Sequence, residues 1–185
     1  SLNYTKEDFI KYNTKPIVFV KTEEWKEGDT LFQPELAKTL MRIRDEGLKG
    51  FYEGETAKLI VAEMQRGKGL INYNDLKNYT VKQRKPIECN YRGYHIVSFP
   101  PSSSGGIMLA QMLKMIEPFP MHDYGFESLR STQLMIEVER RSFADRAEYL
   151  GDPDFWKVPQ KTLLSDAYLK QRMQDYDPAK AGIST

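Results

Sequence analysis

Residues 105–116, with the sequence GGIMLAQMLKMI, restrict the fold of this chain more than any other stretch. If this run is a helix, apolar side chains lie on nearly every side of it, and a helix of that kind is buried all round. A chain of 185 residues is long enough to cover it, because a domain of about 150 residues buries roughly 68 to 70% of the surface that its unfolded chain exposes. The run therefore predicts a globular fold built around this helix.

Helical spacing and capping residues predict the elements that precede this run. Pro34 suits a first helical turn, apolar residues follow three and four positions apart, and Gly47 closes a predicted amphipathic helix over 33–46. Similar signals predict a short helix over 6–12, a helix that ends near Gly67, and a short helix capped by Asn72. Residues 15–30 have no such periodicity and are expected to form an extended segment and a loop.

The period changes to two after Thr80, which is typical of strands. Residues 87–91 and 94–99 are rich in strand-forming side chains and flank Arg92-Gly93, so the pattern predicts a β-hairpin. Two more helices are predicted behind the central one, from Ser128 to Leu150 and from Ser165 to about Asp175. The longer one carries opposite charges four residues apart, which predict a solvated face on the outside of the molecule, at Glu137, Arg141 and Asp145.

Composition and charge exclude several classes of partner. Lys plus Arg number 27 and Asp plus Glu number 26, so no charge excess attracts nucleic acid or anionic lipid. No window reaches the roughly 18 consecutive apolar residues of a membrane span, and the N-terminal sequence SLNYTKEDF has no signal-peptide pattern. The single cysteine, Cys89, cannot form an internal disulfide and is interpreted as a packed strand residue.

Three serines at 102–104, before the apolar run, raise the question of a nucleophile. A serine nucleophile needs a base within hydrogen-bonding reach, and the chain has only His95, expected in a strand, and His122, expected in a loop. An anion cradle at the helix N-terminus is an alternative. The simpler interpretation is that Ser103 or Ser104 caps the helix and that the glycines allow close packing.

Other patterns do not complete a site. Asp152-Pro-Asp154 lacks the spacing of a calcium loop and is interpreted as a turn, and the glycines of residues 66–70 lack the remaining residues of a phosphate-binding loop. The residues by themselves thus predict a soluble, mostly helical α/β module without a complete active site. No catalytic, substrate-binding or metal-ligating residue is assigned.

Six ordered landmarks carry a resemblance to a known family. The chain resembles the γ-glutamyltranspeptidases, also called glutathione hydrolases, over nearly all of residues 30–180. The landmarks are Gln33–Leu36, Phe51–Gly54, Gly69–Ile71 with Asp75–Leu76, Tyr91–Gly93, Pro100–Gly106, and Ala144–Arg146 with Tyr149–Pro153.

This resemblance implies an α+β fold, predominantly helical with a β-hairpin, that is part of an N-terminal-nucleophile (αββα) hydrolase. Such a precursor cuts itself into a large and a small subunit, and the chain resembles the later part of the large subunit. The implied organisation is an N-terminal helix, extended segment and loop at 1–32, the helical and hairpin part at 33–180, and a tail at 181–185 that leads to the processing site.

The same resemblance places the chemistry outside this chain. The nucleophile is the first threonine of the small subunit, in a Thr-Thr-His or Thr-Ala-His segment that this sequence does not contain, and Thr185 matches the linker before that segment. The arginine that binds the glutamate carboxylate belongs to an earlier part of the large subunit. This chain has three serines at 102–104, where the family pattern has two. The resemblance implies that these serines cap the helix and are not nucleophiles.

The implied parent cleaves γ-glutamyl amides such as glutathione and transfers the γ-glutamyl group to water, amino acids or peptides, without metal or organic cofactor. Its partners are the rest of the large subunit, the small subunit and the small-molecule substrate, and its location is periplasmic or extracellular. The chain alone is expected to be inactive and to self-associate through uncovered apolar surface. The alternatives are a non-catalytic interaction module and a related acylase acting on β-lactam or polyglutamate substrates.

Overall fold

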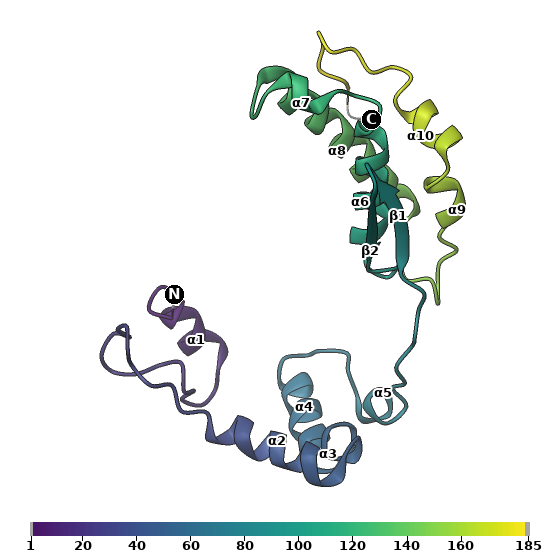
Figure 1. Ribbon diagram of the computed structural model, residues 1–185. Helices are drawn as coiled ribbons and strands as arrows, with labels where there is room; N and C mark the ends of the chain where they lie inside the picture. Colours follow the sequence, from purple (N-terminus) through teal and green to yellow (C-terminus); the bar gives the residue numbers. More distant parts are fainter. Residues whose placement is uncertain (1, 184–185) are drawn as a thin grey trace. The chain divides into compact units, whose positions relative to one another are not determined.

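The computed structural model describes residues 2–183, and the chain divides into two compact units, residues 1–81 and residues 82–185 (Figure 1). The first unit is all helical within its described part. Its helices are α1 (Lys6–Tyr12), α2 (Pro34–Glu46), α3 (Lys49–Tyr52), α4 (Gly54–Arg66) and α5 (Tyr73–Lys77). Four of these helices were predicted from the sequence, and α3 lies where only a turn was expected. At the start of α1 the side chain of Thr5 makes no capping bond.

Local hydrogen bonds fix the turn from α2 through α3 to α4. The Thr56 hydroxyl donates to the carbonyl of Gly50 at 2.7 Å and accepts from Arg42 Nε at 3.0 Å. At α5, Asn72 accepts from the backbone of Asp75, and the Asp75 carboxylate accepts from the backbone of Asn72, so the predicted cap is a complete capping box.

Little of the first unit is buried. Within residues 2–81 the buried positions are Gly50, Thr56 and Ala57. Helix α2 is amphipathic, as predicted, but Leu36, Leu40 and Met41 on its apolar stripe are each about half exposed. Within its described residues this unit therefore leaves an apolar helix face without a covering element of its own.

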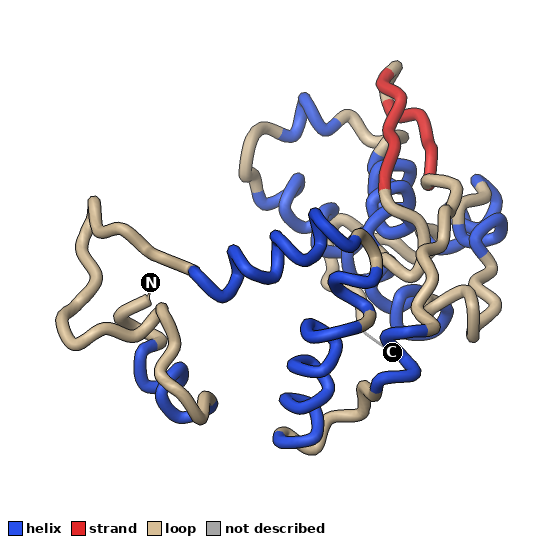
Figure 2. The backbone as a smooth tube through the Cα atoms, turned by 90° about the horizontal axis from the view of Figure 1, so that it is seen from below, coloured by secondary structure: helices blue, strands red, loops and turns tan. Residues whose placement is uncertain are grey.

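The second unit begins with the predicted hairpin, drawn as the two red strands of Figure 2. Strands β1 (Ile87–Tyr91) and β2 (Tyr94–Ser98) pair antiparallel, with Ile87 opposite Ser98 and Cys89 opposite Ile96. Ile87 is fully buried and Cys89 packs beside it, so alternate residues of β1 face the core. The interpretation of Cys89 as a packed strand residue is confirmed.

Helix α6 (Gly105–Ile116) is the centre of the second unit, as the apolar run predicted. It contacts both strands and three helices, namely α8 (Leu129–Tyr149), α9 (Gln160–Leu163) and α10 (Asp166–Arg172), and α7 (Met121–Tyr124) lies in the connection after it. The expectation that α6 is buried all round is wrong, because Leu109 is 38% exposed. The hairpin and helices cover the other sides and leave this one open.

Two apolar clusters flank α6 along its length. The first joins the hairpin to α9 and consists of Ile87, Ile107, Ala110 and Leu163. The second joins α8 to α10 and consists of Met115, Leu134, Val138 and Leu169. Gly106 makes the first cluster possible, because a Cβ atom there would collide with the carbonyl oxygen of Phe99 and crowd the Ile87 side chain.

Two serines begin the helices that cover α6. Ser128 accepts from the backbone N–H of Ser131 at the start of α8, and Ser165 accepts from that of Tyr168 at the start of α10. Both helix starts were predicted. None of the helices in the described residues is long and apolar enough to cross a membrane.

Candidate functional site on the long helix

The serine loop before α6 does what a cap does. Ser103 Oγ accepts the backbone N–H of Gly105 at 3.3 Å. Ser104 occupies the N-cap position but makes no capping bond with its side chain, and its hydroxyl accepts from Arg146 Nε at 3.2 Å. Of the two predicted caps, Ser103 is the one that bonds to the helix, and Ser104 ties the loop to α8.

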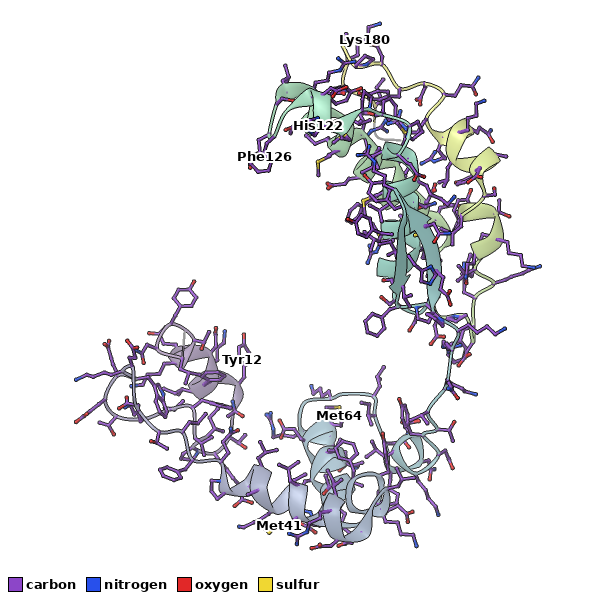
Figure 3. The ribbon with its side chains drawn as sticks, viewed as in Figure 1. Tyr12, Met41, Met64, His122, Phe126 and Lys180 are labelled. Atoms are coloured by element: carbon purple, nitrogen blue, oxygen red, sulfur yellow. The ribbon has the colours of Figure 1, made fainter. Side chains whose placement is uncertain are left out.

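Neither histidine lies with these serines in a catalytic arrangement. The His95 ring, on β2, contacts Asn90 Oδ1 and Glu88 Oε2 at 3.2 Å each, both on the neighbouring strand. The side chain of His122, labelled in Figure 3, is 99% exposed and has Asp123 beside it. Residues 2–183 therefore contain no serine–histidine hydrogen bond, and the structure gives no support to a serine nucleophile in this part of the chain.

The acidic pair at 152 and 154 forms the predicted turn. The backbone N–H of Asp154 donates to Asp152 Oδ1 at 3.0 Å, and Arg84 approaches both carboxylates, with 2.9 Å to Asp154 Oδ1. Over the described residues no group of three or more His, Cys, Asp or Glu side chains is placed to hold a metal ion.

The face of α8 that was predicted to be solvated is instead buried, and that prediction is wrong. Glu137, Arg141 and Asp145 are 4%, 3% and 4% exposed. Their spacing of four residues places them on one face of α8. Helix α10 and the residues after it cover this face, so the charges are paired inside the protein.

Glu137 receives three donors. Its carboxylate accepts from Arg140 Nη2 at 2.8 Å, from Arg141 Nη1 at 2.5 Å and from the backbone N–H of Gly182 at 2.7 Å. Burial of the carboxyl acts to raise its pKa, but the bonds from Arg140, Gly182 and Arg141 outweigh it and lower the pKa of Glu137 to about 2. Glu137 is therefore ionised at neutral pH although it is buried.

Arg141 joins α8 to the end of α10. Its Nε donates to the carbonyl of Arg172 at 2.6 Å, and its Nη2 donates to Asp175 Oδ1 at 2.7 Å. Burial acts to lower the pKa of the guanidinium, but Asp175 and Glu137 raise it above its ordinary value. In return, Arg172 Nη2 donates to the carbonyl of Arg141 at 2.9 Å, so the two arginines exchange bonds between the helices.

Asp145 connects this network to the central helix. It accepts from Gln111 Nε2 of α6 and from the Tyr168 hydroxyl of α10, both at 2.8 Å, and Arg172 Nε lies 3.2 Å away. Burial and the bond to Asp145 raise the pKa of Tyr168, so its hydroxyl keeps its proton and remains a donor. Gln111 also donates to the carbonyl of Leu163, which fixes α9.

The last described residues, 177–183, lie along α8 and bond to it through their backbone. Gln133 Nε2 donates to the carbonyls of Asp177 at 3.2 Å and Lys180 at 3.0 Å. Arg140 Nη1 donates to the carbonyl of Ile183 at 2.6 Å. Beside this segment is a cavity of about 580 Å³ lined by Arg140, Arg141, Phe143, Ala144, Arg172, Asp175 and Ile183.

A sequence model described as Gamma-glutamyltranspeptidase matches residues 2–185. The chain belongs to this family. It is 47% identical over 173 residues to the glutathione hydrolase proenzyme of Escherichia coli K12, an alignment that covers 94% of this chain and 30% of that protein. The chain thus spans about a third of the length of this γ-glutamyltranspeptidase relative, and the recognition from the six landmarks is confirmed.

Solved structures of a γ-glutamyltranspeptidase and of an acylase are similar to this chain. The γ-glutamyltranspeptidase of Helicobacter pylori matches with a TM-score of 0.91 and 38% identity, over 99% of this chain and 53% of that one. A cephalosporin acylase from Bacillus halodurans matches with a TM-score of 0.68 and 28% identity, over 76% of this chain and 26% of that one. The chain, with its helices and two-stranded hairpin, therefore has the fold of the matching part of a γ-glutamyltranspeptidase.

Proposed function

We propose that this chain is the later part of the large subunit of a γ-glutamyltranspeptidase, and that its parent cleaves γ-glutamyl amides such as glutathione. The observation that supports this best is the family match over residues 2–185, together with 47% identity to a glutathione hydrolase proenzyme. The proposed reaction releases the amine of the amide and transfers the γ-glutamyl group to water, to an amino acid or to a peptide.

The proposed chemistry is acyl transfer by an N-terminal threonine of the small subunit. The threonine hydroxyl, deprotonated by its own free amine, adds to the γ-carbonyl carbon, and the C–N bond of the substrate breaks as the leaving amine takes the proton. Water or an acceptor amine then attacks the resulting ester and releases the γ-glutamyl group. This scheme requires no metal or organic cofactor.

In this scheme the chain supplies support. The hairpin and helix α6 are proposed to belong to the αββα arrangement of an N-terminal-nucleophile hydrolase, and α8 with α10 to its outer helical layer. The proposed division of the chain is 1–32, 33–180 and the tail 181–185. No residue of the chain is proposed to bind substrate or to take part in catalysis, and the remainder of the large subunit and the small subunit are its proposed partners.

A comparison of the chain with its parent tests this proposal. The 185-residue chain is expected to release no p-nitroaniline from a γ-glutamyl anilide, and the complete precursor is expected to release it after cleavage into two subunits. Turnover by the chain alone would refute the assignment as a supporting part. A complete parent that neither cleaves itself nor uses the anilide would instead favour a non-catalytic interaction module.

A second candidate is an acylase that removes side chains from β-lactams, and the similarity to a cephalosporin acylase favours it. The two candidates share the acyl-transfer chemistry and differ in the substrate's acyl group. Parallel assays of the complete precursor with a γ-glutamyl anilide and with an acylated cephalosporin separate them. A higher kcat/KM for the cephalosporin would replace the first proposal with the second.

A further inference from the structure

We propose that Gln133, Glu137 and Arg140 form a clamp on the backbone of residues 177–183, and that these three are positioning residues for self-cleavage of the precursor. This inference rests on the proposed function, in which the precursor is cut downstream of this segment. In that cut the threonine oxygen adds to the preceding carbonyl carbon, the C–N bond breaks to give an ester and a free amine, and water hydrolyses the ester.

The spacing of the three side chains carries the first part of the argument. They are four and three residues apart, so they share one face of α8. Along this face Gln133 binds the carbonyls of Asp177 and Lys180, Glu137 binds the N–H of Gly182, and Arg140 binds the carbonyl of Ile183. Every one of these bonds goes to the backbone, so the clamp sets the position of the segment rather than recognising its side chains.

Each clamp residue is itself held in place. The Tyr176 hydroxyl donates to Gln133 Oε1 at 2.8 Å, which turns the amide nitrogen of Gln133 toward the segment. The Tyr176 ring packs edge-on against Phe119 with 5.4 Å between centroids, and so fixes that hydroxyl. Arg140 Nη2 and Arg141 Nη1 both donate to Glu137 Oε2.

The segment gains little from burial, which leaves the clamp bonds as its main attachment. Side chains 178–183 are all exposed, and Ile183 is 82% exposed. Figure 3 shows Lys180 at the outer edge of its unit. The segment adds almost nothing to the core, yet it bonds to a buried carboxylate. We therefore infer that these bonds serve to fix where the segment lies. Position matters for self-cleavage, because misplacing reacting atoms by about 1 Å can slow a reaction about a hundredfold.

Gly182 offers a way to open the clamp without altering the core. A Cβ atom at this position would collide with Arg140 Nη2 and Glu137 Oε2. Both are side-chain ends, so the Arg140 guanidinium can move away at the expense of its bonds to Glu137 and Ile183. Gly182→Ala is therefore expected to release the segment while leaving α6 and its apolar clusters intact.

The test uses the complete precursor and follows its conversion into two subunits. Gly182→Ala is expected to slow self-cleavage tenfold or more, by the order of magnitude that misplacement costs, and Arg140→Met is expected to do the same. Arg140→Lys keeps one donor and is expected to recover part of the rate. The cleaved fraction of each variant is expected to have wild-type kcat and KM with a γ-glutamyl anilide, which a general loss of structure would not give.

Hydrogen exchange separates the clamp from a role in overall stability. In Gly182→Ala, the backbone amide of residue 182, which in the wild type donates to Glu137, is expected to exchange faster by a larger factor than the amides of α6. The matched control is Glu139→Gln, which neutralises an exposed carboxylate of the same helix and is expected to change neither measurement.

The results distinguish this inference from the proposed function. If the wild-type precursor cleaves itself and Gly182→Ala cleaves as fast, the clamp has no role in positioning and the inference fails alone. If the wild-type precursor never cleaves itself, the proposed function fails and takes the inference with it. Equal slowing of cleavage and of turnover by the cleaved fraction would show a general defect and would also refute the clamp.

Discussion

Glu137→Gln removes the charge at the centre of the buried network and keeps the side-chain shape. In the folded protein the pKa of Glu137 is about 2, against an ordinary value of 4.5, after the bonds from Arg140, Gly182 and Arg141 have overcome the cost of burial. The unfolded chain therefore binds this proton more tightly than the folded chain does. The ionised carboxylate stabilises the fold above pH 4.5, and this contribution is lost as the pH falls toward 2.

The two pKa values set the size of the effect. A difference of about 2.5 pH units corresponds to about 3 kcal/mol of stability at pH 7, since each unit is worth about 1.4 kcal/mol. By pH 3 about 2 kcal/mol of this contribution is lost. Glutamine has no titrating proton. We therefore expect Glu137→Gln to be less stable than the unmutated chain by about 3 kcal/mol at pH 7 and by about 1 kcal/mol at pH 3.

Urea unfolding of the second unit measures this difference. Trp156 reports on that unit, because its indole N–H donates to the carbonyl of Tyr149 at the end of α8. The chain has two tryptophans, so Trp25→Phe leaves Trp156 as the only indole fluorophore. Glu139→Gln serves as the exposed control and is expected to show no pH-dependent loss. If the difference in the free energy of unfolding between the unmutated chain and Glu137→Gln stays constant from pH 7 to pH 3, the network does not hold this carboxylate in its ionised form.

Three further predictions follow from packing and exposure. Gly106→Ala is expected to lower the free energy of unfolding by about 1 to 3 kcal/mol, because the new methyl meets the Phe99 carbonyl; Gly105→Ala, with 3.5 Å to its nearest neighbour, is the control, and equal stabilities in urea would contradict the reasoning. The chain is expected to self-associate through the exposed apolar stripe of α2, and Leu40→Lys is expected to lower the mass of the associated species measured by light scattering. An unmutated chain that is monomeric would contradict this expectation. Burial raises the pKa of the Cys89 thiol, so iodoacetamide at pH 8 should alkylate it more slowly than free cysteine, and an equal rate would refute the burial effect.

Local signals predicted most of the secondary structure because those signals act over a few residues. Ser128, Ser165 and Asn72 bond to backbone N–H groups two or three residues away, so their position in the sequence was enough to locate three helix starts. The alternation after Thr80 likewise determined the hairpin, whose strands are adjacent along the chain.

The buried network could not be predicted in this way. Glu137 and Arg141 form the same four-residue pair whether a helix face is solvated or covered, and only the covering elements decide between the two. The covering segments contribute Asp175, which lies 34 residues from its partner Arg141, and Gly182, which lies 45 residues from its partner Glu137. The polar residues of the tail, which predict no helix or strand, gave no signal that a buried carboxylate needs their backbone.

The exposed stripe of α2 is the opposite case. Its spacing predicted an amphipathic helix, and the helix is present, but the described residues of the first unit supply nothing that covers Leu36 and Leu40. Periodicity states that a face is apolar and does not state which segment covers it. The remainder of the parent's large subunit is the proposed cover.

Because residues 177–183 are attached to α8 through main-chain groups, the attachment depends on the number of residues in the segment and not on their side chains. Exchanging Pro178 or Ala179 for another side chain leaves the partners of Gln133 in place, whereas inserting a single residue between Lys180 and Gly182 would offer Glu137 a different amide. In this part of the molecule the number of residues, more than their identity, is the quantity that the fold specifies.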